Sequence, residues 1–290
     1  MSTSLSVGSQ SMVAPLKRVL VKRPDEAFGN ADPKQWHYTS QPNLTEAQKE
    51  HDALVELLKQ AGADVVYHDT PTPNMADAIF VHDPVIVSNQ GAILLNMGKS
   101  LREGEPAAIA QTLKSQGIPI HYQLQGNARA EGGDLLWVDE KTLAVGQGFR
   151  TNGPGFAQLR EALSPQGVDL IPIQLPYYHG PEACLHLMSF ISLIDHKLAV
   201  VYPPLMPVPF WQFLQQRGFQ FVEVPDEEFE SMAPNVLALA PGVCLMLEGN
   251  PITQERLSQA GCEVLTYKGD EISRKAEGGA TCLTRPILRQ

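Results

Sequence analysis

Four side chains that could together perform nucleophilic chemistry recur at intervals along this chain. They are Asp83, Glu131, His186 and Cys282, and successive members are 48, 55 and 96 residues apart. A thiolate is a nucleophile, an imidazole moves protons near neutral pH, and a carboxylate can orient the imidazole or bind a cation. Alone, each of these residues is most often an ordinary core or turn residue. Brought together, they would supply the parts of a cysteine–histidine catalytic site.

A repeat of about fifty residues could bring these side chains together. Each unit is expected to hold a strand, an amphipathic helix and two further strands, with the chemically capable residue near the last strand. The first strands are expected at 18–22, 92–96, 142–145, 197–202 and 243–248, and the helices at 46–60, 105–116, 155–163, 208–216 and 253–259. The later strands are expected at 64–67 and 78–87, 118–122 and 134–138, 169–174 and 186–194, 220–224 and 236–239, and 263–267 and 281–287.

Strands that alternate with helices predict an α/β protein. Five similar units predict a five-bladed α/β propeller, in which β-α-β-β units of about 50 residues are related by pseudo-fivefold symmetry. Equivalent positions of such a ring point at one axis, so the four side chains should converge. An ordinary doubly wound sheet is the alternative.

Composition narrows the range of partners. The net charge is -10, which argues against nucleic acid and anionic membranes because no basic excess would neutralise phosphates. An acidic surface could attract a cationic substrate, although it could equally serve solubility. No apolar run approaches the roughly 18 residues of a spanning helix, and the Ser-rich start does not resemble a secretory signal.

The remaining expectations concern domains and cysteines. Residues 1–12 are expected to be a flexible tail and 13–290 a single catalytic domain in a reducing, cytoplasmic compartment. No C-x-x-C pair occurs, so neither a zinc nor a redox motif is indicated. Cys184, Cys244 and Cys262 are expected to be free, buried, small apolar residues.

Five motifs in this order resemble the arginine deiminase–amidinotransferase superfamily, the guanidine-modifying enzymes with a five-bladed α/β propeller (pentein) fold. Within that superfamily the motifs are most similar to the dimethylarginine dimethylaminohydrolases, and the likeness covers nearly the whole chain. The motifs are Asp77–Asp83, Glu131–Leu136, Gly148–Asn152, Leu185–Phe190 and Thr281–Cys282.

The resemblance implies a role for each matching residue. Cys282 would attack the guanidinium carbon, His186 would act as general acid and base, and Glu131 would orient the histidine. Asp83 would bind the guanidinium, and Asp77 would hold the substrate near its amine end. Arg102 and Arg150 would clamp the substrate carboxylate, while Phe80 and His82 would complete the substrate-binding set. No metal and no organic cofactor are implied.

Two departures leave the substrate open. His82 stands where dimethylarginine enzymes usually carry glutamate, and Met188 stands where deiminases carry a second guanidinium-binding aspartate. Met188 would favour a methylated guanidinium, because it accepts no strong hydrogen bond from an N–H group. An arginine deiminase, a dihydrolase, an amidinotransferase and a noncatalytic binding propeller are alternatives. Residues 25–38 could form a lid, and a homodimer is one candidate assembly.

Overall fold

The computed structural model describes residues 7–181, 183 and 185–290, and within them fifteen strands form five three-stranded sheets. The sheets, here called blades 1 to 5, each take their strands from neighbouring parts of the chain except where the ring closes. Blade 1 is β15–β1–β2 (Arg285–Arg289, Leu16–Val21, Asp64–Tyr67) and blade 2 is β3–β4–β5 (Val85–Ser88, Gly91–Leu94, Ile120–Gln123). Blade 3 is β6–β7–β8 (Leu135–Asp139, Thr142–Gln147, Asp169–Gln174). Blade 4 is β9–β10–β11 (Ile191–Asp195, Leu198–Val201, Gln220–Glu223), and blade 5 is β12–β13–β14 (Leu237–Ala240, Val243–Leu247, Glu263–Tyr267).

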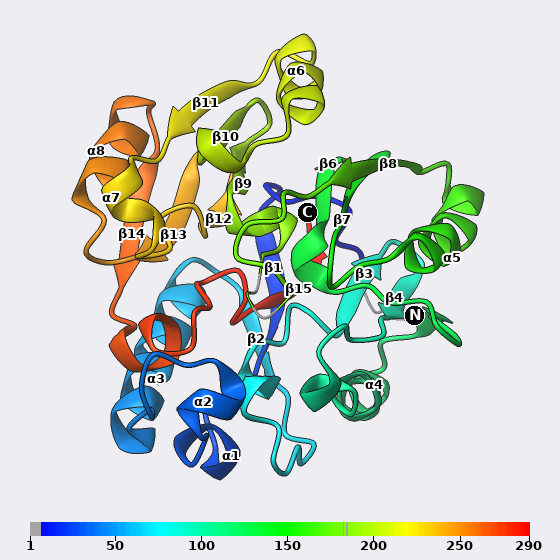
Figure 1. Ribbon diagram of the computed structural model, residues 1–290, viewed down its shortest axis with the longest axis vertical. Helices are drawn as coiled ribbons and strands as arrows, with labels where there is room; N and C mark the ends of the chain where they lie inside the picture. Colours follow the sequence, from blue (N-terminus) through cyan, green and yellow to red (C-terminus); the bar gives the residue numbers. More distant parts are fainter. Residues whose placement is uncertain (1–6, 182, 184) are drawn as a thin grey trace.

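Every blade repeats the same pairing. The middle strand is antiparallel to the first strand and parallel to the third, which it reaches through a helix. Parallel neighbours require such a crossover connection. The crossover helices are α3 (Leu44–Gln60), α4 (Glu105–Ser115), α5 (Gly153–Leu163), α6 (Val208–Gln216) and α8 (Pro251–Gln259), and they lie at the outside of the ring in Figure 1.

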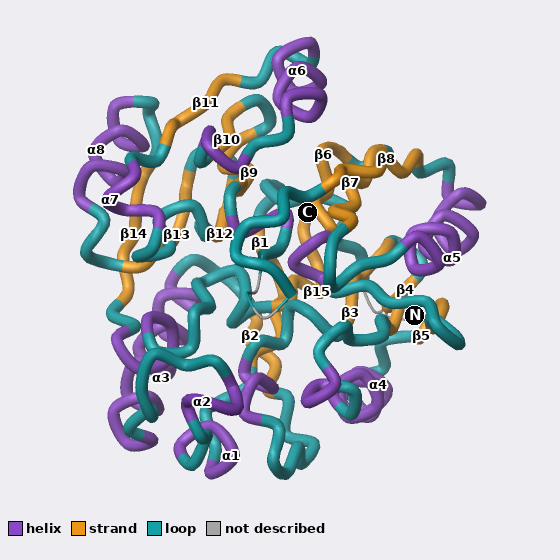
Figure 2. The backbone as a smooth tube through the Cα atoms, viewed as in Figure 1, coloured by secondary structure: helices purple, strands orange, loops and turns teal. Residues whose placement is uncertain are grey.

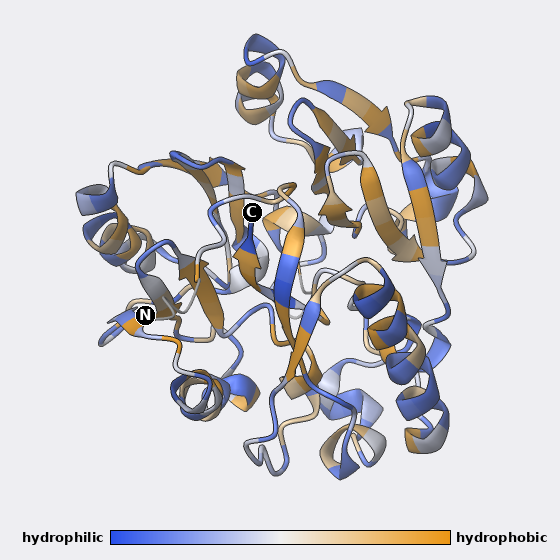
Figure 3. Ribbon diagram, turned by 180° about the vertical axis from the view of Figure 1, so that it is seen from behind, coloured by the Kyte–Doolittle hydropathy of each residue, from blue (hydrophilic) through white to orange (hydrophobic). Residues whose placement is uncertain are grey.

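Five apolar cores within the described residues show that the blades form a closed ring. Each core lies between two consecutive blades, and the fifth lies between blade 5 and blade 1. Side chains alternate across a strand, so Val19 and Val21 of β1 enter the core shared with blade 5, while Leu20 enters the core shared with blade 2. Figure 3 shows the hydrophobic residues concentrated on the strands and on the inward faces of the helices. The five-bladed propeller is therefore confirmed, and the doubly wound alternative is wrong.

The ring closes through β15, which pairs with β1 in antiparallel register, Leu20 facing Arg285. Residues 7–12 reinforce this closure, since the Gly8 N–H donates to the Ile287 carbonyl at 3.0 Å and Ser9 and Gln10 are buried. The tail expected at 1–12 is thus wrong from residue 7 onward, while residues 1–6 lie outside the described part of the chain. The spacing of apolar residues could not predict this anchoring, because the anchoring depends on main-chain hydrogen bonds.

The residues predicted to do chemistry precede the innermost strands rather than lying within them. Short 3-10 turns occupy Ala76–Ile79, Gly132–Asp134 and Leu187–Ser189, and β15 begins only at Arg285. Further 3-10 turns occupy Ser100–Arg102, Ser164–Gln166 and Pro203–Leu205, and a π-helix spans Asp270–Arg274. The strands expected from 78, 186 and 281 therefore start later. Figure 2 shows the strands of the five blades in orange, the helical segments in purple and the connecting loops in teal.

Three short helices complete the fold: α1 (Glu26–Gly29), α2 (Pro33–Trp36) and α7 (Asp226–Phe229). The first two occupy the segment proposed as a lid, where Phe28, Trp36 and Tyr38 are buried in the core of blades 1 and 5. Cys244 and Cys262 are free and buried as expected, and Cys184 lies outside the described residues. None of the described helices has the length and apolarity that crossing a membrane requires.

Candidate active site

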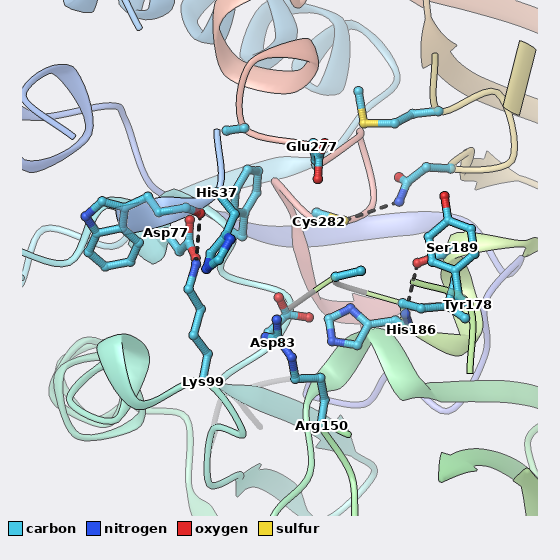
Figure 4. A pocket seen from close by; sticks show the side chains of 18 of the residues that line it. His37, Asp77, Asp83, Lys99, Arg150, Tyr178, His186, Ser189, Glu277 and Cys282 are labelled. Atoms are coloured by element: carbon cyan, nitrogen blue, oxygen red, sulfur yellow. Dashed lines mark hydrogen bonds and ion pairs between the residues drawn. The ribbon is translucent and has the colours of Figure 1, made fainter. Parts of the chain in front are cut away.

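A cavity of about 270 Å³ lies where the turns before the innermost strands meet. Seven of the nine predicted site residues line it: Cys282, His186, Asp83, Asp77, Arg102, Arg150 and Phe80. Figure 4 shows Cys282, His186 and Asp83 around one space, although they come from three different blades. The cavity does not reach the other two: Glu131 lies directly behind His186, and His82 is buried elsewhere.

Glu131 and His186 form a buried pair. Nε2 of His186 lies 2.7 Å from Oε2 of Glu131, and the Gly98 N–H donates to Oε1 of the same carboxylate at 2.8 Å. Burial alone would raise the pKa of Glu131, but the bond and charge of His186, with Arg150 nearby, lower that pKa to about 2. Glu131 is therefore ionised at neutral pH, and its carboxylate fixes the orientation of the imidazole.

Blade 3 holds the histidine from a second side. The Leu187 N–H donates to Oδ1 of buried Asp134 at 2.9 Å, and the hydroxyl of Thr151 donates to Oδ2 at 2.6 Å. Gly133 allows the ring to approach, because a Cβ there would lie 2.4 Å from Nδ1 of His186. The conspicuous glycines of the Glu131–Leu136 motif thus serve close packing rather than a flexible loop.

Cys282 sits in the turn between Gly279 and β15, partly exposed to the cavity. Its sulfur accepts a hydrogen bond from Nδ2 of Asn235 at 3.2 Å, the dashed line at Cys282 in Figure 4. Burial and the charge of Asp83 raise the pKa of the thiol to about 11, against the opposing effects of His186 and Asn235. The thiol is therefore protonated at neutral pH, and a cation placed beside it would favour the thiolate.

Asp83 lies within hydrogen-bonding distance of both the main chain and an arginine. Oδ1 accepts from the Gly133 N–H at 3.0 Å, and Oδ2 accepts from Nη1 of Arg102 at 2.7 Å. Burial would raise the pKa of Asp83, but the charges of Arg102 and His186 outweigh it and hold that pKa below its ordinary value. Oxygen atoms of Asp83 and Glu131 and a nitrogen of His186 all lie within 4.8 Å of one another. Such a trio could hold a metal ion, yet each member already takes part in the hydrogen bonds given above.

Arg102 has a different role from the predicted carboxylate clamp. Its guanidinium is buried between two carboxylates, with Nε donating to Glu105 at 2.9 Å and Nη1 to Asp83 at 2.7 Å. Nη2 donates to Glu105 at 2.8 Å and to the Phe80 carbonyl at 3.1 Å. Because these acceptors hold the guanidinium in the wall, we assign Arg102 to orienting Asp83 and correct the expectation of a clamp.

The far end of the cavity contains a second cation that sequence reasoning missed. Nζ of Lys99 lies 2.6 Å from Oδ2 of Asp77 and 4.8 Å from the centre of the Trp36 ring. The hydroxyl of Tyr38 donates to Oδ1 of Asp77 at 2.8 Å. Asp77 therefore lines the cavity as part of an ion pair, and Arg150 lies nearby, with Nη1 3.4 Å from Glu131.

Two side chains invoked for specificity point away from the cavity. His82 is buried, with Nδ1 2.9 Å from the Thr284 carbonyl, and burial lowers its pKa to about 3, so it is neutral. Met188 is buried in the apolar core of blades 3 and 4, and Ser189 lines the cavity instead. The expected contact of His82 with substrate is therefore wrong. The expected apolar wall at Met188 is also wrong, because the turn before β9 places Met188 in the apolar core.

Comparison with known proteins decides the family. The model of the family described as "N,N dimethylarginine dimethylhydrolase, eukaryotic" matches residues 19–289. The chain belongs to this family. The assignment places it among hydrolases that act on C–N bonds and within the wider superfamily suggested by the motifs.

Individual relatives agree with this dimethylargininase family. The chain is 29% identical over 271 residues to N(G),N(G)-dimethylarginine dimethylaminohydrolase of Streptomyces coelicolor, covering 93% of this chain and 96% of that one. It superposes with a TM-score of 0.79 and 23% identity on a cysteine-to-serine variant of the Pseudomonas aeruginosa enzyme complexed with citrulline, covering 94% and 100% of the two chains. The N-terminal domain of a cyanobacterial arginine dihydrolase, bound to product, gives 0.80 and 20% over 94% and 97%. These two structural likenesses show the fold.

Lys99, Asn235 and Glu277 are among the cavity residues of this dimethylargininase-family chain that escaped sequence reasoning. In Figure 4, Glu277 lies on the opposite side of Cys282 from Asp83, and burial raises its pKa. Lys99 and Glu277 stand in loops of ordinary composition and gave no signal. Asn235 did leave one, because the spacing of 96 between His186 and Cys282 spans two repeats and implies a missing residue between them.

Proposed function

We propose that this protein hydrolyses the guanidinium group of a methylated arginine to citrulline and an amine, through a covalent thiouronium on Cys282. The observation that carries the proposal is the convergence of Cys282, the His186–Glu131 pair and Asp83 on one cavity. Membership of the dimethylargininase family supports the substrate class. No metal or organic cofactor is needed for the steps below.

Binding prepares both reactants. A guanidinium is a planar, permanently charged fork of N–H donors, and a carboxylate such as Asp83 binds it with two matched hydrogen bonds. The bound cation offsets the charge of Asp83, which otherwise raises the pKa of Cys282. Substrate therefore favours ionisation of its own nucleophile, and His186 takes the thiol proton.

The proton transfers of the covalent cycle then require only one acid–base residue, His186. The sulfur attacks the guanidinium carbon, the bond to the substituted nitrogen breaks, and His186 delivers its proton to the departing amine. His186 next takes a proton from water, the hydroxide attacks the thiouronium carbon, and the carbon–sulfur bond breaks. The sulfur recovers a proton from His186, citrulline leaves, and the remaining substrate proton ends on the released amine.

Lys99 and Arg150 are the cations that support recognition of the substrate carboxylate, in place of the pair first predicted. Both line the cavity: Lys99 lies beside Asp77, and Arg150 is linked to Glu131 and so to the histidine. An ammonium group would meet Glu277 or Asp77 there. The cavity thus offers both charges of an amino acid, which favours arginine derivatives over simple guanidines.

The runner-up is hydrolysis of arginine itself, by a deiminase or dihydrolase using the same intermediate. Two observations support this alternative: an arginine dihydrolase domain has a similar fold, and Met188 is buried away from the cavity. The ratio of kcat/KM for dimethylarginine and arginine on one preparation decides between them. A ratio above one supports the methylated substrate, and a ratio below one promotes the alternative.

The nucleophile is tested separately from the substrate. Cys282→Ser should abolish citrulline formation while the far-ultraviolet circular dichroism stays unchanged, whereas Cys262→Ser, a buried matched control, should keep activity. Peptide mass spectrometry of the wild type, quenched with acid during turnover, should show the thiouronium adduct on Cys282. An adduct on another cysteine, or full activity in Cys282→Ser, would refute the mechanism.

A further inference from the structure

Each blade contributes one polar side chain just before its innermost strand. Asp83 precedes β3, Glu131 β6, His186 β9, Asn235 β12 and Cys282 β15. Successive members are 48, 55, 49 and 47 residues apart, so Asn235 fills the place left between the histidine and the cysteine. Four of these positions carry groups with a role in the proposed chemistry, which raises the question of what the fifth does.

The amide of Asn235 has an orientation fixed by its neighbours. The main-chain N–H of Thr281 lies 3.0 Å from Oδ1, and a main-chain N–H can only donate, so the atom facing it must be the oxygen. The NH₂ end therefore faces the sulfur of Cys282, 3.2 Å away. This assignment does not depend on distinguishing nitrogen from oxygen by position, because the hydrogen-bond partners decide it.

The surroundings keep that donor in place. Asn235 is 8% exposed, and its own N–H donates to the Met232 carbonyl at 3.0 Å. The next residue is tied to Ser192, whose Oγ accepts from the Val236 N–H at 3.2 Å. Gly279 leaves room for the amide, since a Cβ there would lie 2.5 Å from Oδ1 of Asn235. The amide is thus held rigidly against the nucleophile.

We propose that Asn235 is a catalytic residue that donates a hydrogen bond to the sulfur of Cys282 and stabilises it as a thiolate, both when it attacks and when it leaves the thiouronium. A thiolate accepts an N–H donor more strongly than a thiol does. The donor is neutral, so it favours the anion without competing with the cationic substrate for Asp83. The effect on turnover rests on the proposed function, whereas the effect on the thiolate does not.

The charge balance around the sulfur makes this donor consequential. Burial and Asp83 both oppose ionisation of Cys282, and the Asn235 amide acts with His186 in the other direction. Losing one hydrogen bond to an ionised group shifts a pKa upward by roughly one unit. Residual thiolate is then scarcer but more nucleophilic, so the net rate of attack should fall about three- to fourfold.

The test replaces the donor while keeping the shape. Asn235→Asp retains an oxygen for the Thr281 N–H but presents a second acceptor, with negative charge, to the sulfur. The readout is the second-order rate of Cys282 alkylation by iodoacetamide at pH 8, with the site mapped by peptide mass spectrometry, and it needs no substrate. Alkylation should slow at least tenfold in Asn235→Asp and about three- to fourfold in Asn235→Ala. The acid limb of the kcat/KM profile should move to higher pH in both variants.

A matched control separates this effect from loosening of the turn. Ser192→Ala removes the Val236 anchor but leaves the Asn235 amide against the sulfur, so alkylation should stay within about twofold of wild type. The proposal would be overturned if Cys282 of Asn235→Asp were alkylated at the wild-type rate, or if the alkylation rate fell as much in Ser192→Ala as in Asn235→Asp. If Asn235→Asp does not fold, Asn235→Ala with the same control decides. Slowed alkylation in a protein that hydrolyses no guanidine would sustain the thiolate role and reject the proposed function instead.

Discussion

At the scale of single residues, each catalytic group depends on neighbouring residues that fix its orientation and its charge. Glu131 is ionised although buried, because His186, Arg150 and two main-chain N–H groups surround it. Arg102 neutralises two further buried carboxylates. The charged groups around Cys282 are therefore paired within the protein, although the charge of Asp83 still raises the pKa of the Cys282 thiol.

The Glu131 carboxylate should link stability to acid. Its pKa, about 2 in the folded protein, lies below the ordinary value of about 4.3, so it contributes stability above that ordinary value and loses it as pH falls toward 2. We expect wild type to lose more unfolding free energy than Glu131→Gln between pH 5 and pH 3. Urea denaturation at both pH values measures this, and parallel curves for the two proteins would contradict it.

Replacing Arg102 should mainly affect stability, whereas replacing Arg150 should mainly affect substrate preference. Removing Arg102 strands the charges of Asp83 and Glu105 in a buried site, which costs about 3–5 kcal/mol of unfolding free energy. Arg150→Ala should cost much less stability but should weaken arginine-like substrates more than agmatine. Denaturation and paired kcat/KM values measure both effects. A stable Arg102→Ala variant that has lost only its preference for the carboxylate would restore the clamp role.

How far the sequence predicts the site also depends on the residue. Cys282, His186, Glu131 and Asp83 follow from repeat position, since equivalent positions of a ring share an axis. His82 and Arg102 do not, because neighbouring turn residues point in different directions and a long side chain can reach either cavity or wall. Their directions are set by contacts with Thr284 and Glu105, which no local pattern reveals.

At the scale of elements, α3 carries an unusual residue toward the core. His51 is fully buried, neither ring nitrogen has a hydrogen-bond partner among the described residues, and burial lowers its pKa to about 4. Helix periodicity predicts α3 well from Leu54 and Leu58 but says nothing of the histidine on the same face. The short helices α1 and α2 were missed because four-residue helices carry no periodicity.

Replacing His51 should therefore strengthen α3. His51→Leu removes unpaired ring nitrogens, which cost about 1–3 kcal/mol when buried, and we expect a higher unfolding free energy at pH 7. The lowered histidine pKa means that wild type loses stability as pH falls from about 6.5 toward 4, so the advantage of leucine should grow over that range. Thermal melts at pH 7 and pH 5 test this, and an advantage that shrinks on acidification would contradict it.

At the scale of the whole molecule, the repeat predicts the ring but not how the ring is locked. Gln10 joins two blades: its Oε1 accepts from the Asn89 N–H at 2.7 Å, and its Nε2 donates to the Glu140 carbonyl at 2.9 Å. These bonds lie outside every repeat unit and involve a Ser-rich segment that resembles a loose tail. Periodicity could not reveal them, because main-chain acceptors are available in any sequence.

Gln10 should contribute measurably to stability. Two hydrogen bonds of about 1 kcal/mol each are lost in Gln10→Ala, so we expect its unfolding free energy to fall by about 1–2 kcal/mol. Gln90→Ala, an exposed neighbour, is the matched control and should change little. Urea denaturation monitored by tryptophan fluorescence measures both, and equal midpoints for the three proteins would assign the bracing to the main chain around Gly8 alone.

The antiparallel pairing of β1 with β15 has a consequence for folding speed. It places the two ends of the described chain side by side, so the ring is a circle with a single break, and the pairing across that break is the most distant contact in the sequence. Circular permutation could move the break to the exposed turn at Gly167 by joining residue 290 to residue 7. The closing strands would then become neighbours in sequence, whereas β7 and β8 would lie at opposite ends of the chain, so the slow long-range pairing would move from blade 1 to blade 3. Cys282 would then lie in the interior of the chain, followed directly by β15 and β1 of blade 1.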